Sequence, residues 1–234
     1  MPHVTAIMPT IPSRASVAAK VVPRLLAQVS QLYLHLNGHE ELPTWARHPK
    51  IRPLRHPAGT GPAIRFSTLP KKGQYVLFVD DDLLYPADYV VQSVTALNRL
   101  GSGTAIAYHG SAWKRGAPPT FNGGRSILPF YAGCPKDAPI TYVGCGTLGL
   151  RLPDAARLDL KVPKTFEFED DVWISSAIAR AGLRVFRPSS PKGWIVATPA
   201  AYNGLYKAAC KDKFEKRNRA LTAALALGKW SLST

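Results

Sequence analysis

The sequence is short of acidic residues, cysteines and long apolar runs, and each shortage excludes a class of protein. Its 234 residues carry 30 Lys and Arg against 15 Asp and Glu, a formal net charge of +15. No apolar stretch approaches the roughly 20 residues that span a bilayer, and the start "MPHVTAIMPTIPSR" lacks the pattern of a signal peptide. The cysteines, Cys134, Cys145 and Cys210, fit neither a disulfide framework nor a zinc site. We therefore expect a protein of the reducing cytoplasm.

Strand-like and helix-like runs alternate through the first 100 residues. Strands are predicted at 4–10, 32–38, 50–57 and 75–79, and helices at 16–29 (kinked or divided at Pro23), within 58–70, and at 86–100. Further strands are predicted at 104–113 and 140–152, and a helix followed by a short strand at 170–186. This order predicts an α/β fold, with a doubly wound, mostly parallel sheet flanked by helices. No repeat or Ser/Gly linker divides the chain, so we expect a single domain over 1–234.

Three adjacent aspartates, Asp80, Asp81 and Asp82, follow the apolar run at 75–79 in "QYVLFVDDDLLYP". Ligands of open α/β sheets bind beyond the carboxyl ends of the strands. Adjacent carboxylates relieve their repulsion by protonation, by pairing with Lys or Arg, or by binding a divalent cation. Capping of the next helix explains one aspartate but not three. The run therefore predicts a site for Mg²⁺ or Mn²⁺ together with phosphate oxygens.

A second acidic segment, "FEFEDDVWISSAIARAG" (166–182), begins a predicted helix. A carboxylate there can take a proton from a reacting hydroxyl. The helix dipole lowers its pKa and neighbouring carboxylates raise it, so the balance stays open, as does the alternative of a simple capping cluster.

Taken in order, these segments resemble glycosyltransferases of the GT-A fold, and in particular the inverting family-2 enzymes. "VLFVDDDLLYP" is similar to their Asp-x-Asp segment, with Asp81 in the middle. The resemblance implies that Asp80 orients the nucleotide or shares the metal, and that Asp82 ligates Mn²⁺ or Mg²⁺ on the donor diphosphate. Asp81 would share either task.

The same resemblance assigns further donor contacts. "VTAIMPTIPSR" is similar to the opening strand and nucleotide-binding loop, which contains Pro9, Thr10 and Arg14. "GTGPAIRF" is similar to a glycine-proline helix start with a basic residue near the donor; here that residue is Arg65 where Lys is expected. A solvated helix residue is the alternative for Arg65.

On the acceptor side, the family's acidic pair falls on Asp170 and Asp171, with Asp170 in place of the usual Glu and Glu169 offering a second register. Asp171 is then the general base, with Asp170 beside it. "YVGCGTLGLR" (142–151) is similar to the segment that approaches donor sugar and acceptor, through Gly144, Cys145 and Gly146. Nothing beside Cys145 would activate its thiol, so we expect it to pack.

The resemblance implies a nucleotide-binding half at about 1–100, an acceptor and catalytic half at about 101–190 and a helical tail at about 200–234. The implied reaction is metal-dependent, inverting transfer from a nucleotide-diphosphate sugar, UDP-sugar by default, to a glycan, lipid-linked or other hydroxyl acceptor. The tail segment "CKDKFEKRNRALTAALAL" (210–227) places Cys210, Phe214, Leu221 and Leu225 on one helical face. That face either lies peripherally on anionic membrane or packs on the domain.

Two alternatives remain. A sugar-phosphate nucleotidyltransferase would usually open with a glycine-rich loop, which "MPTIPSRAS" lacks. A basic nucleic-acid-binding domain would use the positive surface, but no recognised binding motif is present, so we expect no specific nucleic acid.

Overall fold

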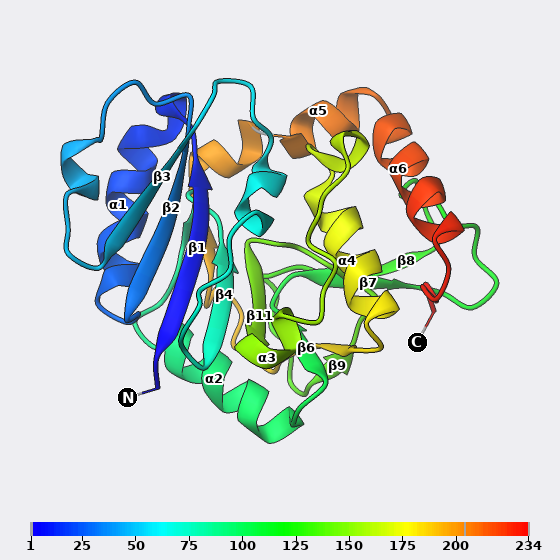
Figure 1. Ribbon diagram of the computed structural model, residues 1–234. Helices are drawn as coiled ribbons and strands as arrows, with labels where there is room; N and C mark the ends of the chain where they lie inside the picture. Colours follow the sequence, from blue (N-terminus) through cyan, green and yellow to red (C-terminus); the bar gives the residue numbers. More distant parts are fainter. Residues whose placement is uncertain (1, 204, 234) are drawn as a thin grey trace.

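The computed structural model describes residues 2–203 and 205–233, and its centre is an eight-stranded sheet (Figure 1). From one edge to the other, the strands are β3 (Ile51–His56), β2 (Gln31–Asn37), β1 (Val4–Thr10), β4 (Tyr75–Val79), β11 (Thr147–Arg151), β6 (Thr104–Ala107), β12 (Arg184–Arg187) and β9 (Ala138–Pro139). The pairs among β3, β2, β1 and β4 are parallel, as is β6 with β12. The predicted class is confirmed: a mixed α/β protein with a mostly parallel, Rossmann-like central sheet.

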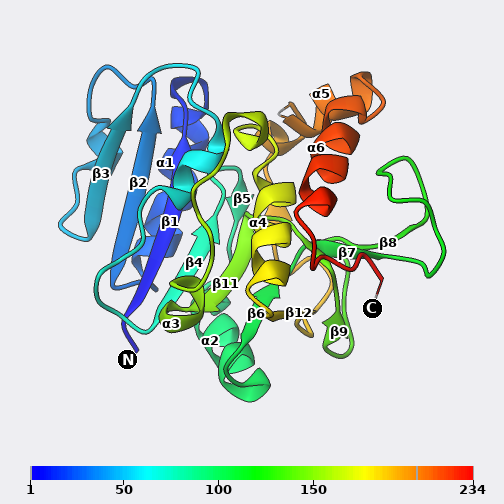
Figure 2. The ribbon, with the colours of Figure 1, turned by 45° about the vertical axis from the view of Figure 1, so that its right-hand side comes forward.

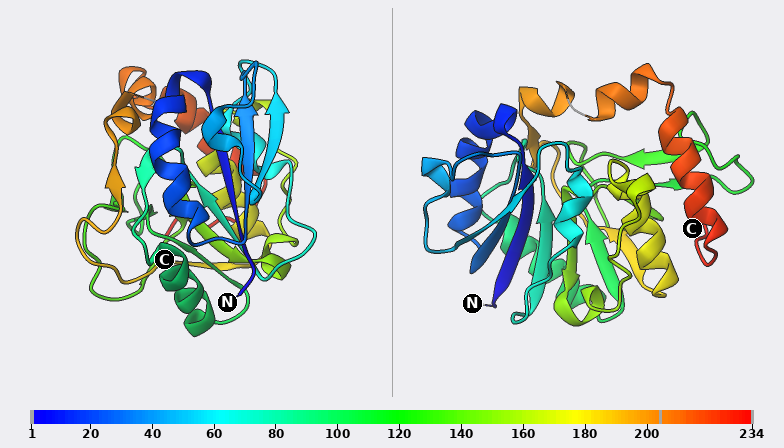
Figure 3. Two further views of the ribbon diagram at one scale, coloured as in Figure 1. Left: turned by 90° about the vertical axis from the view of Figure 1, so that its left-hand side faces the viewer. Right: turned by 45° about the horizontal axis from the view of Figure 1, so that its top comes forward.

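Helices cover both faces of this sheet, which leaves the parallel strands buried on both sides (Figure 3). The main ones are α1 (Ala15–Leu26) and α2 (Tyr89–Leu100) on one face, and the 3₁₀ helix η3 (Pro62–Phe66), α3 (Leu152–Ala155) and α4 (Asp170–Arg180) on the other. A hydrophobic core lies on each face of the sheet, and alternate side chains of β4 point into one or the other. Leu77 packs with α1 and α2, whereas Phe78 packs with η3 and α4. Shorter 3₁₀ helices are η1 (Pro12–Arg14), η2 (Thr44–Ala46), η4 (Lys164–Phe166) and η5 (Pro199–Asn203).

Strands β1 and β4 separate at their carboxyl ends. Their pairing ends at Ile7 and Phe78, while β1 stays paired with β2 as far as Thr10. The strand order reverses direction here, because β2 lies on one side of β1 and β4 on the other. A sheet of this kind binds ligands at such a switch point.

Several predicted elements differ in detail from the structure. Helix α1 runs through Pro23 without dividing. Helix α2 begins at Tyr89, three residues later than predicted. The strand predicted at 104–113 is two strands, β6 and β7 (Gly110–Trp113), and the strand predicted at 140–152 is β10 (Tyr142–Val143) and β11. Strand β11 lies antiparallel between β4 and β6.

The second half of the chain adds two small sheets and a helical tail. The sheets are β10-β7-β8, with β8 (Arg125–Leu128), and β13-β5, with β13 (Val196–Ala197) and β5 (Leu83–Leu84). The tail is α5 (Leu205–Lys211) and α6 (Glu215–Ala226), and α6 lies alongside α4 (Figure 2).

The tail does not form the single continuous apolar face that we predicted. Lys213 and Phe214 have positive φ angles, which break the helix between α5 and α6. Cys210 is exposed, whereas Leu221 is buried in a cluster with residues of α4. The apolar side chains of α6 therefore pack against α4. Within the described ranges, no helix is long and apolar enough to cross a membrane.

Candidate active site

The three aspartates follow β4 at the switch point, beside the carboxyl end of β1. Pro9 and Thr10 are the last two residues of β1 and lie beyond its pairing with β4. Asp80 keeps about a third of its side chain exposed, whereas Asp81 and Asp82 are buried. None of the three caps a helix: α2 has Asp88 at its N-cap position.

Arg14 joins the loop after β1 to two of these aspartates. Its Nη1 lies 2.9 Å from Asp81 Oδ1 and 2.8 Å from Asp82 Oδ2. One guanidinium therefore serves two buried carboxylates. Burial and the charge of Asp80 together raise the pKa of Asp82 to about 7, despite the opposing effect of Arg14.

Arg65 connects the two acidic segments. Its Nη2 lies 2.8 Å from Asp80 Oδ1, and its Nε lies 3.2 Å from Asp170 Oδ2. The side chain of Arg65 is only 5% exposed, so the alternative of a solvated helix residue is wrong. Burial raises the pKa of Asp170 to about 7, against the opposing charge of Arg65.

Asp171 is held in a different way, by neutral donors. Its Oδ1 accepts a hydrogen bond from the backbone N–H of Cys145 at 2.7 Å, and its Oδ2 accepts one from the hydroxyl of Tyr142 at 3.3 Å. Asp171 is half-buried, whereas Asp170 is buried. Of this pair, Asp171 is thus the carboxylate that keeps access to solvent without an arginine bound to it.

The segment that contains Gly144, Cys145 and Gly146 lies against both acidic groups. A Cβ at Gly146 would lie 2.0 Å from Asp80 Oδ2, so a side chain at this position has no room. A Cβ at Gly144 would lie 2.7 Å from the ring of His109. Cys145 is buried, and its burial raises the pKa of the thiol well above its usual value, which fits the predicted packing role.

Two contributors to the site were not predicted from the sequence. The hydroxyl of Tyr85 accepts a hydrogen bond from the backbone N–H of Asp80 at 2.7 Å and donates one to the carbonyl of Gly146 at 2.6 Å. Nε of Arg217, in α6, lies 2.6 Å from the carboxylate of Glu169, so an ion pair joins the tail helix to the second acidic segment. Tyr85 stands in the same quoted stretch as the aspartates, but nothing in the sequence links Arg217 to Glu169.

The net charge of the site is negative when all its groups are ionised, which favours the binding of a cation. Six carboxylates meet three arginines, so the fully ionised groups sum to three negative charges; the carboxylates are Asp80, Asp81, Asp82, Glu169, Asp170 and Asp171, and the arginines Arg14, Arg65 and Arg217. The buried Nη1 of Arg65 also has no hydrogen-bond partner among the described residues.

The chemistry of these groups fits a hard divalent cation, because such ions prefer carboxylate oxygens. Asp80 is the most accessible of the three aspartates, and the pKa of Asp82 is raised first by burial and then by the negative charge of Asp80. Among the described residues, the group of three whose ligand atoms lie within 4.8 Å of one another is Cys145, Asp170 and Asp171, and the three aspartates after β4 do not form such a group. The thiol of Cys145 is a softer donor than a carboxylate, so by ligand chemistry alone the aspartates suit Mg²⁺ or Mn²⁺ better.

Comparisons with known proteins identify no family for the chain. No protein-family model matches it, and the search of curated proteins found no match. Among solved structures, it is similar to 4-diphosphocytidyl-2C-methyl-D-erythritol synthase from Anaerococcus prevotii, at 10% identity over 67% of this chain and 73% of that one, with a TM-score of 0.39.

Proposed function

We propose that the protein is a divalent-metal-dependent transferase acting on a nucleotide-diphosphate sugar, and that it transfers the sugar to a hydroxyl group with inversion. The observation that carries the proposal is the meeting of two acidic segments at the switch point of the sheet, joined through Arg65. One segment suits a metal and phosphates, and the other offers a separate carboxylate for proton transfer.

On the donor side, Asp80 and Asp82 would hold the cation, with Arg14 holding Asp82 together with Asp81, and Arg65 holding Asp80. A bound Mg²⁺ or Mn²⁺ supplies neutralisation of the negative charge on the departing diphosphate. Pro9 and Thr10 are the last residues of β1 and lie at the same switch point of the sheet, where the nucleotide contacts expected of them would be made. Arg65 would act on the donor mainly by holding Asp80, since its guanidinium is buried.

On the acceptor side, Asp171 would serve as the general base. The acceptor hydroxyl gives its proton to the Asp171 carboxylate while its oxygen bonds to the anomeric carbon, and the bond from that carbon to the diphosphate oxygen breaks. The hydrogen bonds from Cys145 and Tyr142 orient the carboxylate for this task. Gly144 and Gly146 would keep the neighbouring backbone free of side chains where sugar and acceptor meet.

Nucleotidyl transfer to a sugar phosphate is the second candidate, and the solved structure named above is a synthase of a diphosphocytidyl compound. That reaction also uses a nucleotide and a cation, so the donor side fits it equally well. The acceptor side favours glycosyl transfer, because a phosphate nucleophile carries negative charge at neutral pH and would approach a surplus of carboxylates. A neutral hydroxyl meets no such repulsion and needs the base that Asp171 offers.

The products distinguish the two reactions. We would incubate the protein and Mn²⁺ with a panel of nucleotide-diphosphate sugars, and separately with nucleoside triphosphates and sugar phosphates. Release of nucleoside diphosphate from one nucleotide sugar supports glycosyl transfer. Release of pyrophosphate from a nucleoside triphosphate, with none of the first activity, replaces our proposal by the second candidate, and the absence of both activities refutes the nucleotide-dependent assignment.

A further inference from the structure

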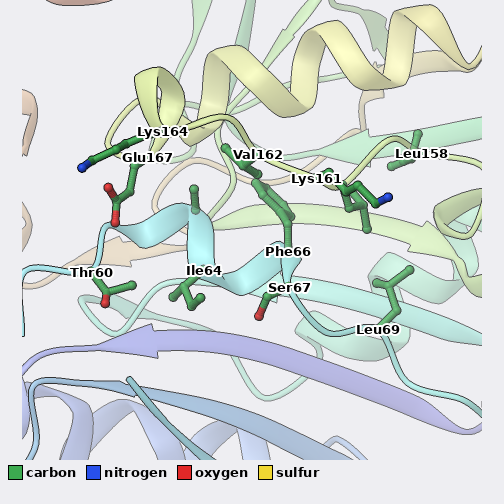
Figure 4. A pocket seen from close by; sticks show the side chains of 12 residues that line it. Thr60, Ile64, Phe66, Ser67, Leu69, Leu158, Lys161, Val162, Lys164 and Glu167 are labelled. Atoms are coloured by element: carbon green, nitrogen blue, oxygen red, sulfur yellow. The ribbon is translucent and has the colours of Figure 1, made fainter. Parts of the chain in front are cut away.

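A groove outside the proposed active site lies between η3 and the segment 158–164, which leads into η4 (Figure 4). Its volume is about 700 Å³, within the range of small-molecule sites. The walls are mainly apolar and include Ile64, Phe66, Leu69, Leu158, Leu160 and Val162. None of the aspartates assigned to the metal or to the base lines it.

The sequence of the segment explains why the groove stays open. In "LDLKVP", apolar Leu158, Leu160 and Val162 alternate with polar residues or proline, which is the pattern of an extended chain with one apolar face. Among the residues that the structure describes, no strand pairs with this segment, and its apolar face borders the groove beside η3. Leu160, Val162 and Ile64 of the facing helix therefore remain half-buried rather than fully packed.

The charged side chains around the groove are chiefly cationic. Lys161 lies at one end beside Leu69 and Leu158, and Lys164 lies at the other beside Thr60 and Glu167 (Figure 4). Glu167 accepts a hydrogen bond from the backbone N–H of Gly61. It is the one carboxylate among the lining residues that the structure describes.

The side chain of Lys161 is not paired with a carboxylate in the part of the chain that the structure describes. The nearest acidic residue in sequence, Asp159, is 3.5 Å from Arg180 and also accepts the backbone N–H of Lys161. Among the described residues, no ion pair is formed by the ammonium group of Lys161, which is exposed at the groove end. An exposed ammonium at the end of an apolar channel suits an anionic group that is carried on an apolar chain.

We propose that this groove binds a single-chain amphiphile with an anionic head, of the fatty carboxylate class. The chain lies along Ile64, Leu160 and Val162, and the carboxylate pairs with Lys161. The site is separate from the proposed transferase chemistry, so binding does not depend on Asp82 or Asp171.

Titration calorimetry with dodecanoate, at concentrations below its micelle formation, tests the proposal on the full chain. Lys161→Glu should weaken binding by about tenfold or more, the equivalent of about 1.4 kcal/mol. Ile64→Asn should weaken it similarly by placing an amide on the apolar wall. Lys20→Glu is the matched control, because Lys20 is an exposed lysine of α1 on the opposite face of the sheet, and it should change binding by less than about twofold.

Three further measurements complete the test. Dodecyltrimethylammonium, with the same chain and a cationic head, should bind at least about tenfold more weakly than dodecanoate. Asp82→Asn and Asp171→Asn should bind dodecanoate like the unchanged protein, which separates this site from the proposed function. Equal binding of both amphiphiles, equal losses in Lys161→Glu and Lys20→Glu, or no binding of dodecanoate would each overturn the proposal.

Discussion

Arg65 and Asp170 form an ion pair, with the guanidinium Nε 3.2 Å from the carboxylate Oδ2. The two residues are remote in the sequence, and the same guanidinium also binds Asp80 at 2.8 Å. All three sit at the junction of the proposed donor and acceptor sides. Arg65 is therefore the arginine that links the two acidic segments, whereas Arg14 and Arg217 each pair with one of them.

Removing Arg65 should destabilise the fold. Arg65→Met leaves Asp80 and Asp170 without their cation, and breaking a buried pair in this way typically costs about 3–5 kcal/mol. The free energy of unfolding in urea measures the loss. Adding Asp170→Asn to the same variant should recover part of it, because the uncompensated charge of Asp170 is then gone.

A surface ion pair provides the control for Arg65. Arg99 is half-exposed and pairs with Asp137 at 2.7 Å. Arg99→Met should cost no more than about 1 kcal/mol, as exposed pairs do. Similar losses in Arg65→Met and Arg99→Met would show that the buried pair has no special role.

Asp171→Asn should stop transfer without disturbing the fold. The amide oxygen can still accept the hydrogen bond from Cys145 N–H, but the side chain can no longer take a proton. Transfer should fall by roughly 10²-fold or more, the usual contribution of a general base. Nucleotide affinity and melting temperature should stay close to those of the unchanged protein. Full activity in this variant would remove Asp171 as the base and redirect attention to Asp170 or Glu169.

Asp82→Asn and chelation should have the same effect on nucleotide-diphosphate binding. With Mn²⁺ present, the variant should bind about tenfold or more weakly, since a hard cation depends on its carboxylate ligands. In excess EDTA, the unchanged protein and the variant should bind equally weakly. Asp137→Asn, which changes a carboxylate remote from β4, is the control. Calorimetric affinity that is indifferent to EDTA would refute the metal requirement.

Gly146→Ala tests the close approach of the glycine segment to Asp80. The added Cβ would lie 2.0 Å from Asp80 Oδ2, and Arg65 and Tyr85 restrain the movement of that aspartate and its backbone. We expect a loss of cation-dependent nucleotide affinity of about tenfold or more, as the aspartate moves out of place. Gly123→Ala is the matched control, because a Cβ there meets nothing within 4 Å. Equal affinities for the two variants would contradict the role assigned to Gly146.

His35 should make stability depend on pH. Its Nδ1 lies 2.9 Å from His56 Nε2, and burial, followed by the positive charges of His56 and Arg65, lowers its pKa to about 3. Between pH 6.5 and about 3, His35 is protonated in the unfolded chain but stays neutral in the folded protein. The free energy of unfolding therefore falls as the pH falls. This one group contributes up to about 1.4 kcal/mol per pH unit.

The variant His35→Gln lacks this titration. Its free energy of unfolding should fall less steeply between pH 6 and pH 4 than that of the unchanged protein, by up to that amount per pH unit. His48→Gln, at an exposed histidine, should keep the original slope. Parallel slopes for all three proteins would show that His35 titrates normally.

Local pattern in the sequence predicted the elements that decide the fold class. The apolar run at 75–79 had to be buried on both faces, and it is the central strand β4. Because the aspartates follow it directly, their position at the carboxyl edge of the sheet was predictable as well. The break between α5 and α6 and the antiparallel course of β11 were not, since alternating or helical periodicity carries no information on strand direction or on a turn formed by Lys213 and Phe214.

The sequence by itself therefore determined an α/β sheet with carboxylates at a strand end, and a second acidic group at the start of a helix. Only the tertiary structure decided how the charges pair: Arg65 with both Asp80 and Asp170, Arg14 with Asp81 and Asp82, and the tail residue Arg217 with Glu169. It also decided that Asp171 is bound by Cys145 N–H and left free of arginine. The reason is physical: periodicity is set by neighbours along the chain, whereas a distance of about 3 Å between remote side chains depends on strand order and register, which local sequence does not encode.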